Sequence, residues 1–158
     1  MERYSDYWIA EQIRKEGTAW VMKQRFWLFG TATYTHGADV TFEDATRHGR
    51  RFFNALDRAV LPRKQLREGQ RLRRLTFVER GRLRANTHIH FFIKGFEWQQ
   101  YHSICNASKQ LWNTLIDGAA DIRLQDNVTA NTDRAGYCWK EVRGDLADVL
   151  LTDCCHLD

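Results

Sequence analysis

The chain has 158 residues, of which 43% are hydrophobic and 28% are charged, and its formal net charge is +4. This length and composition are typical of one globular domain, here residues 1–158, and argue against a disordered chain. The longest apolar run is too short to cross a membrane, and residues 1–30 lack the pattern of a signal peptide. We therefore expect a cytoplasmic protein with no membrane partner.

The first half of the chain alternates between helical and strand patterns. Residues 4–16 carry apolar side chains at helical spacing. Residues 25–35 are rich in aromatic residues and threonine, which favour a buried strand. Thr41 has the character of a helix N-cap because acidic residues follow it in the first turn. We expect this helix to run to about Val60 and to be ended by Pro62.

The second half continues with strands and helices in a similar order. Alternating and periodic apolar residues predict strands at 73–80, 87–94, 120–125 and 148–154, and helices at 98–116 and from Asn131 or Thr132 to Val142. After the N-terminal helix the expected order is β-α-β-β-α-β-α-β. This order predicts an α+β fold built on a split βαβ core.

Basic residues gather in the middle of the chain, between the predicted helix at 41–60 and the strand at 87–94. The segment "RKQLREGQRLRR" and the residues that follow it contribute Arg63, Lys64, Arg67, Arg71, Arg73, Arg74, Arg80, Arg82 and Arg84. A local basic surface of this kind favours a polyanion such as nucleic acid. The alternative is a solvated loop that binds nothing, which a run of charges by itself equally permits.

The stretch "THIHFFIKG" contains two histidines within an apolar strand pattern. Side chains alternate between the two faces of a strand, so His88 and His90 lie side by side while the intervening Ile89 faces the core. Glu79, on the preceding strand, would lie beside them in an antiparallel hairpin. Two imidazoles and one carboxylate predict a site for Mg²⁺ or Mn²⁺ that acts on a phosphate. In the alternative, the histidines are ordinary surface residues and Glu79 pairs with an arginine.

A second group of chemically reactive residues lies in "GYCWKEV", at 136–142. Tyr137 and Lys140 are three residues apart, which places them on one face of the predicted helix. A tyrosine whose hydroxyl meets a metal-bound phosphate can attack it and form a covalent phosphotyrosine. The lysine can neutralise the charge of the phosphate.

Three motifs, in this order, resemble those of the HUH endonucleases, in particular the single-tyrosine rolling-circle replication initiator (Rep) proteins. "FGTATYT" at 29–35 looks like the first-strand motif of that family, "HIHFFIKG" at 88–95 like its metal motif, and "YCWKE" at 137–141 like its nucleophile motif. The resemblance spans about residues 25–142.

The resemblance implies an RRM-like core with an antiparallel sheet of about five strands and flanking helices. It also implies an enzyme that nicks and rejoins single-stranded DNA at an origin, such as a hairpin. The metal, Mg²⁺ or Mn²⁺, would be held by His88, His90 and Glu79. Tyr137 would form a 5′-phosphotyrosine and Lys140 would assist it. A host replication helicase would be a further partner, in the host cytoplasm if the chain is encoded by a phage or plasmid.

Other classes of protein remain open. The same core serves transposases and relaxases, although a relaxase would carry a third histidine in the cluster. A histidine-triad hydrolase would need a histidine where this chain has Phe92. Outside enzymes, the order of elements also fits a non-catalytic RNA-recognition module, in which exposed aromatic residues on the sheet would stack on bases.

Overall fold

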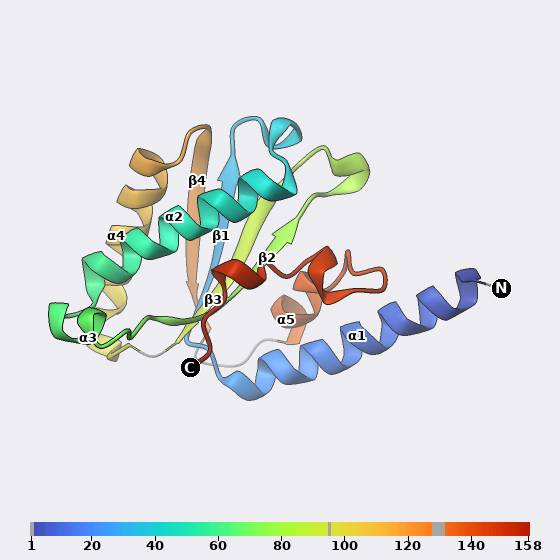
Figure 1. The fold of residues 1–158 in the computed structure, drawn as a ribbon, viewed down its shortest axis with the longest axis horizontal. Coiled ribbons are helices and arrows are strands. Elements are labelled where there is room, and N and C mark those ends of the chain that lie inside the picture. The colour runs from blue at the N-terminus through green and yellow to red at the C-terminus, as the bar shows by residue number, and fades with distance from the viewer. Residues whose placement is uncertain (1, 95, 128–131) are drawn as a thin grey trace.

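The computed structural model describes residues 2–94, 96–127 and 132–158 and has an α+β fold, as the sequence predicts (Figure 1). Its sheet is antiparallel, with the strand order β2-β3-β1-β4. The strands are β1 (Leu28–Tyr34), β2 (Arg73–Glu79), β3 (His88–Lys94) and β4 (Ala119–Asp126). The helices are α1 (Glu2–Gln24), α2 (Phe42–Val60), α3 (Arg63–Arg67), α4 (Tyr101–Leu115) and α5 (Thr132–Cys138). Short 3₁₀ turns lie at Gly37–Asp39, Arg82–Arg84, Trp98–Gln100, Leu146–Asp148 and Thr152–Cys154.

Helices cover both faces of the sheet. On the first face, α2 and α4 pack over a core that includes Phe52, Phe91 and Trp112. On the second face, α1 and α5 lie over a cluster that includes Phe77 and Trp139. Within the described residues, no helix is both long and apolar enough to span a membrane.

The second face is only partly covered. The β4 residues that share it with the histidines of β3 are Asp121, Arg123 and Gln125, and all three are exposed. Ile122 points to the first face and is buried. The part of the second face formed by β4 is therefore open to solvent.

Local signals explain where α2 begins and ends. The Thr41 side chain accepts a hydrogen bond from the backbone N–H of Asp44, and the Asp44 carboxylate accepts one from the backbone N–H of Thr41. This capping box satisfies donors that a helix start otherwise leaves unpaired. The helix ends at Val60, before Pro62, so the prediction for this element is confirmed.

Two predicted helices have different lengths in the structure. The helix expected at 4–16 extends over Glu2–Gln24, because its apolar and polar residues are mixed around the axis and periodicity alone does not define its ends. The helix expected to run to Val142 ends at Cys138, and residues 139–141 form turns. Asn131, one of its two expected caps, lies outside the described residues.

The strand predicted at 148–154 does not form, so the described sheet has four strands where about five were expected. The segment does run along the free edge of β2, where isolated bridges pair Leu150 with Phe77 and His156 with Arg74. Between these bridges the 3₁₀ turn Thr152–Cys154 interrupts the pairing and directs Cys154 inward against α2. An irregular segment thus protects the edge of the sheet.

Arg74 is buried, so the prediction that it contacts nucleic acid is wrong. Its Nη1 atom lies 3.0 Å from both carboxylate oxygens of Asp57, and its Nε donates to the carbonyl of Cys154. Asp57 also accepts a hydrogen bond from the backbone N–H of Leu72. Because a buried charge needs a partner, this arginine joins β2 to α2 and the C-terminal segment instead of facing solvent.

The Asp57→Ala substitution should destabilise the protein by about 3–5 kcal/mol, because it leaves the buried Arg74 guanidinium without its counter-ion. The matched control is Glu68→Ala, which removes an exposed pair with Lys64 at 4.0 Å and should cost less than about 1 kcal/mol. Urea unfolding of both variants measures the difference. Equal losses of stability would contradict a structural role for the Asp57–Arg74 pair.

Candidate functional site

The pairing of β2 with β3 brings an acidic and two imidazole side chains together. Glu79 is the cross-strand partner of His88, and Phe77 is the partner of His90, so the three polar side chains share the second face of the sheet. One ligand atom from each of Glu79, His88 and His90 lies within 4.8 Å of the others. Between the histidines, Ile89 points to the opposite face and is buried in the core.

Hydrogen bonds fix the orientation of both imidazole rings. The Nε2 atoms of His88 and His90 lie 2.7 and 2.9 Å from the same oxygen of Glu79, Oε2. The Nδ1 atom of His88 lies 2.9 Å from the carbonyl oxygen of Asn86, and that of His90 lies 2.9 Å from the hydroxyl of Thr31. Without an ion, the Nε2–H groups donate to Glu79; when an ion replaces those protons, Nδ1–H can donate to the Asn86 and Thr31 oxygens, and both Nε2 lone pairs then face the same point. This is the arrangement by which outer partners orient metal-binding histidines.

The cluster is almost enclosed, and its charges depend on one another. Burial alone would raise the pKa of Glu79, but hydrogen bonds from His88, His90 and Lys140 outweigh it and hold that pKa well below its usual range. Burial likewise favours the neutral form of His88, yet the Glu79 carboxylate outweighs it and raises the pKa of this histidine. For His90, burial dominates and lowers the pKa.

The donor set is suited to a divalent metal ion. Two imidazole nitrogens and one ionised carboxylate oxygen can bind one ion and leave further coordination positions for water or substrate. Because Glu79 raises the pKa of His88, an ion must displace a proton from His88, so binding should weaken as the pH falls. The alternative from the sequence, in which Glu79 pairs with an arginine, is wrong: its described charged partners are His88, His90 and Lys140.

Tyr137 reaches this cluster from α5. Its hydroxyl donates to Oε1 of Glu79 at 3.2 Å, and its ring meets His90 edge to face at 5.5 Å. The side chain is nevertheless 46% exposed, so the hydroxyl is both held at the cluster and accessible to a large substrate.

Lys140 lies beside Tyr137, but not on the helix that the sequence predicts. The helix has ended, and Lys140 is in the turn that follows. Its ammonium group is nonetheless 3.7 Å from the centre of the Tyr137 ring and pairs with Oε1 of Glu79. The turn therefore places the lysine where the helical spacing was expected to place it.

Two residues without a role predicted from the sequence, Glu141 and Arg14, hold this turn in place. The Glu141 carboxylate accepts hydrogen bonds of 2.7 Å from the backbone N–H groups of Arg80 and Gly81, just beyond the end of β2. Arg14 of α1 donates to the carbonyl oxygens of Lys140 and Val142. No spacing rule reveals such contacts, since they join segments far apart in the sequence.

Close packing of α1 against the same turn requires a glycine. The ring of Trp139 lies so near Gly17 that a Cβ atom there would come within 2.6 Å of it. A side chain at position 17 would push α1 away from the turn, and Arg14 with it.

The remaining basic residues named from the sequence form two groups at opposite ends of β2. One group is at its start: Arg63, Lys64 and Arg67 are exposed on α3, and Arg71 and Arg73 are half-buried. The other group follows its last residue: Arg80, Arg82 and Arg84 line a pocket together with Lys140. Because a strand of this length spans roughly 20 Å, only the second group adjoins the cluster.

No family model, no curated protein and no solved structure matches the chain. The functional assignment therefore rests on the chemistry and geometry of the site.

The Thr31→Val substitution should weaken Mn²⁺ binding by roughly 10–100-fold, because it removes the hydroxyl that orients the His90 ring. The matched control is Thr33→Val, two residues along the same strand, whose hydroxyl donates to the backbone carbonyl of Asp121 instead. Isothermal titration of the metal-free protein measures both affinities, and the His88→Ala, His90→Ala double variant defines the loss of the site. Wild-type affinity in Thr31→Val would contradict the proposed orientation, and wild-type affinity in the double variant would refute the metal site.

Proposed function

We propose that the chain is a metal-dependent endonuclease and strand transferase that acts on single-stranded DNA through a covalent 5′-phosphotyrosine. The observation that carries the proposal is the position of the Tyr137 hydroxyl, 3.2 Å from Oε1 of Glu79, while Oε2 of the same carboxylate contacts both histidines. A nucleophile, a metal-binding cluster and a cation thus meet at one carboxylate. This is the chemistry expected of an HUH endonuclease of the single-tyrosine Rep type.

The proposed reaction is a transfer of the DNA phosphate to Tyr137. The phenol oxygen attacks the phosphorus, the bond to the 3′ oxygen breaks, and that oxygen leaves as a 3′ hydroxyl after taking up a proton. The phenol proton passes to solvent, to which the half-exposed side chain has access. Glu79, His88 and His90 would hold Mg²⁺ or Mn²⁺, which acts as a Lewis acid on the scissile phosphate. Attack by a 3′ hydroxyl on the phosphotyrosine reverses the step and rejoins the strands.

Lys140 is suited to stabilise charge, not to remove a proton. Burial would lower its pKa, but hydrogen bonds to Glu79 and Tyr137 outweigh this and raise the pKa above its usual value. The ammonium group therefore stays protonated near neutral pH. A fixed positive charge beside the nucleophile stabilises the phosphate as negative charge builds up in the transition state.

The structure does not favour the alternative of a non-catalytic RNA-recognition module. An RNA-recognition module would use exposed aromatic residues on the sheet to stack bases. On the second face, Phe29 and Phe92 are 8% and 1% exposed and lie in the cluster beneath α1 and α5. They are not accessible to bases, and that alternative gives no role to the meeting of Tyr137, Lys140 and Glu79.

Within this chemistry we propose the initiation of rolling-circle replication, with an origin hairpin as substrate and a host helicase as partner in the host cytoplasm. The cluster contains two histidines in the described residues and not the three of a relaxase. A transposase would instead join two separate DNA ends, which a strand-transfer assay with two labelled oligonucleotides distinguishes.

The Tyr137→Phe substitution removes one oxygen atom and should abolish both nicking and the covalent adduct while DNA binding persists. The assay is incubation with a labelled library of hairpin-bearing single-stranded oligonucleotides and Mn²⁺, followed by denaturing electrophoresis. Tyr101→Phe is the matched control and should react normally, since Tyr101 lies on α4 against the first face of the sheet. An adduct that persists in Tyr137→Phe would assign the chemistry to another tyrosine, such as Tyr34 or Tyr101.

The Lys140→Ala substitution should slow nicking and rejoining by similar factors, on the order of 100-fold, because the same charge stabilises both directions of one transition state. It should leave the covalent adduct detectable and the metal requirement unchanged. Single-turnover rates of the forward and reverse reactions provide the measurement. A variant that nicks normally but fails to rejoin would show that Lys140 has a different role.

A further inference from the structure

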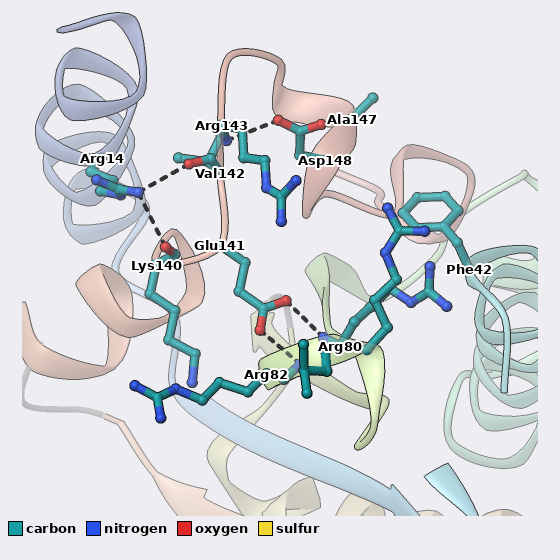
Figure 2. Close-up of a pocket in the computed structure, with 13 residues that line it drawn as sticks. Arg14, Phe42, Arg80, Arg82, Lys140, Glu141, Val142, Arg143, Ala147 and Asp148 are labelled. Atoms are coloured by element: carbon teal, nitrogen blue, oxygen red, sulfur yellow. Dashed lines mark hydrogen bonds between the residues drawn. The ribbon is translucent and has the colours of Figure 1, made fainter. Parts of the chain in front are cut away.

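A basic pocket of about 650 Å³ adjoins the Tyr137 site and is open to solvent (Figure 2). Its walls come from α1, from the connection between β2 and β3, and from the segment that follows α5. Six basic side chains line it: Arg14, Arg80, Arg82, Arg84, Lys140 and Arg143. Lys140 belongs to both the pocket and the candidate site, so the two are continuous.

The hydrogen bonds of the two acidic side chains in the pocket go to backbone N–H groups instead of to the guanidinium groups of these arginines. Glu141 accepts hydrogen bonds from the backbone N–H groups of Arg80 and Gly81, and Asp148 accepts one from that of Arg143 (Figure 2). Asp148 also accepts from the backbone N–H groups of the two residues that follow Arg143. In the part of the chain that the structure describes, no carboxylate forms an ion pair with the side chain of Arg80, Arg82, Arg84 or Arg143. The Nε atoms of Arg14 and Arg80 are moreover buried without a hydrogen-bond partner.

Six basic side chains against two carboxylates leave this pocket with an excess of positive charge, which is unfavourable for the free protein because like charges repel. It becomes favourable when a polyanion enters and replaces the missing counter-ions. The pocket therefore has the electrostatic character of a phosphate-binding site, and it shares Lys140 with the proposed active site.

The tip of the connection between β2 and β3 has a second feature that suggests ligand binding. Leu83 is 99% exposed and has φ of 57°, and Arg84 has the same φ. Residues other than glycine rarely adopt this left-handed conformation, and a leucine at such a position is a marked exception. Glu141 anchors the base of the connection through Arg80 and Gly81, so the strained tip stands on a fixed base. A large apolar side chain held out into solvent between two arginines is positioned to contact a ligand.

We propose that this pocket binds one nucleotide of the substrate strand beside the scissile phosphate. Arg80, Arg82 and Arg84 contact its phosphates, and the base packs against Leu83. The half-buried Phe42 supplies an apolar wall on the side of α2. This proposal rests on the proposed function for the identity of the ligand as single-stranded DNA, but binding can be measured without cleavage.

The phosphate contacts are tested by the salt dependence of DNA binding. Fluorescence anisotropy with labelled oligo(dT), in EDTA to prevent cleavage, gives the slope of log affinity against log salt concentration. The Arg82→Gln, Arg84→Gln double variant should reduce the magnitude of this slope by about 1.4, since each lost phosphate contact removes about 0.7 for a single strand. The control Arg51→Gln, Lys109→Gln removes the same charge from α2 and α4 and should leave the slope unchanged.

The base contact is tested with Leu83→Ser, which should not disturb folding because the side chain is exposed. This variant should bind oligo(dT) about tenfold more weakly, a loss that corresponds to the burial of most of one leucine side chain. It should bind an abasic phosphodiester oligomer of equal length as well as the wild type does. Equal losses with both oligomers, or no loss with either, would overturn the base contact.

An unchanged salt slope in the double arginine variant would overturn the phosphate contacts. Nicking is measured in a separate assay, so failure of the nucleotide pocket can be distinguished from failure of the proposed nicking reaction. Normal nicking with an unchanged slope and unchanged Leu83→Ser binding refutes the nucleotide pocket alone. The expected binding effects without any covalent adduct would support the pocket and refute the proposed reaction.

Discussion

The carboxylate of Glu79 is the interaction on which the site depends. Its oxygen Oε2 is hydrogen-bonded to the Nε2 atoms of both histidines. Its oxygen Oε1 accepts a hydrogen bond from the Tyr137 hydroxyl and forms an ion pair with the Lys140 ammonium group. Burial of an unpartnered carboxylate would be costly, and His88, His90 and Lys140 keep it ionised by lowering its pKa. One side chain at the end of β2 therefore links β3, α5 and the turn after α5, with the two histidines on one side of it and Tyr137 and Lys140 on the other.

The positions of Tyr137 and Lys140 depend on contacts outside the cluster. The turn that carries Lys140 is held by Glu141 against the end of β2 and by Arg14 against α1. Trp139 also holds the turn, because its ring packs over Gly17 of α1 and lies edge to face with Phe77 of β2. Groups that must meet within hydrogen-bond distance need supporting contacts of this kind, because a small displacement of the turn would remove Lys140 from Glu79.

The cluster of Glu79, His88 and His90 was predictable because it depends on local rules. Alternation along a strand places His88 and His90 on one face, and an antiparallel hairpin brings Glu79 to the same face. Thr31 lies in the segment "FGTATYT", but its hydrogen bond to His90 could not be predicted. That bond depends on the residue-by-residue register of β1 against β3, which the order of elements does not specify.

Features that depend on tertiary contacts were predicted only in part from the sequence. Arg74 belongs to a basic run but is buried, because Asp57 lies opposite it. The predicted last strand becomes an irregular edge, because Cys154 turns inward. Lys140 was predicted on a helix that ends two residues earlier, but it still lies beside Tyr137, because its backbone N–H donates to the Tyr137 carbonyl in the following turn. Arg14 and Arg143 enter the pocket from segments remote from the basic run, so no local pattern identifies them.

The central claim is that the Tyr137 oxygen becomes bonded to a DNA phosphate. The most direct measurement is mass spectrometry of the wild-type protein after incubation with Mn²⁺ and circular single-stranded DNA of random sequence, which presents every recognition site at once. After digestion with nuclease and trypsin, the peptide at residues 135–140 should carry a nucleotide attached through phosphate to Tyr137. An adduct on any other peptide, or cleaved DNA without a protein adduct, would contradict the account.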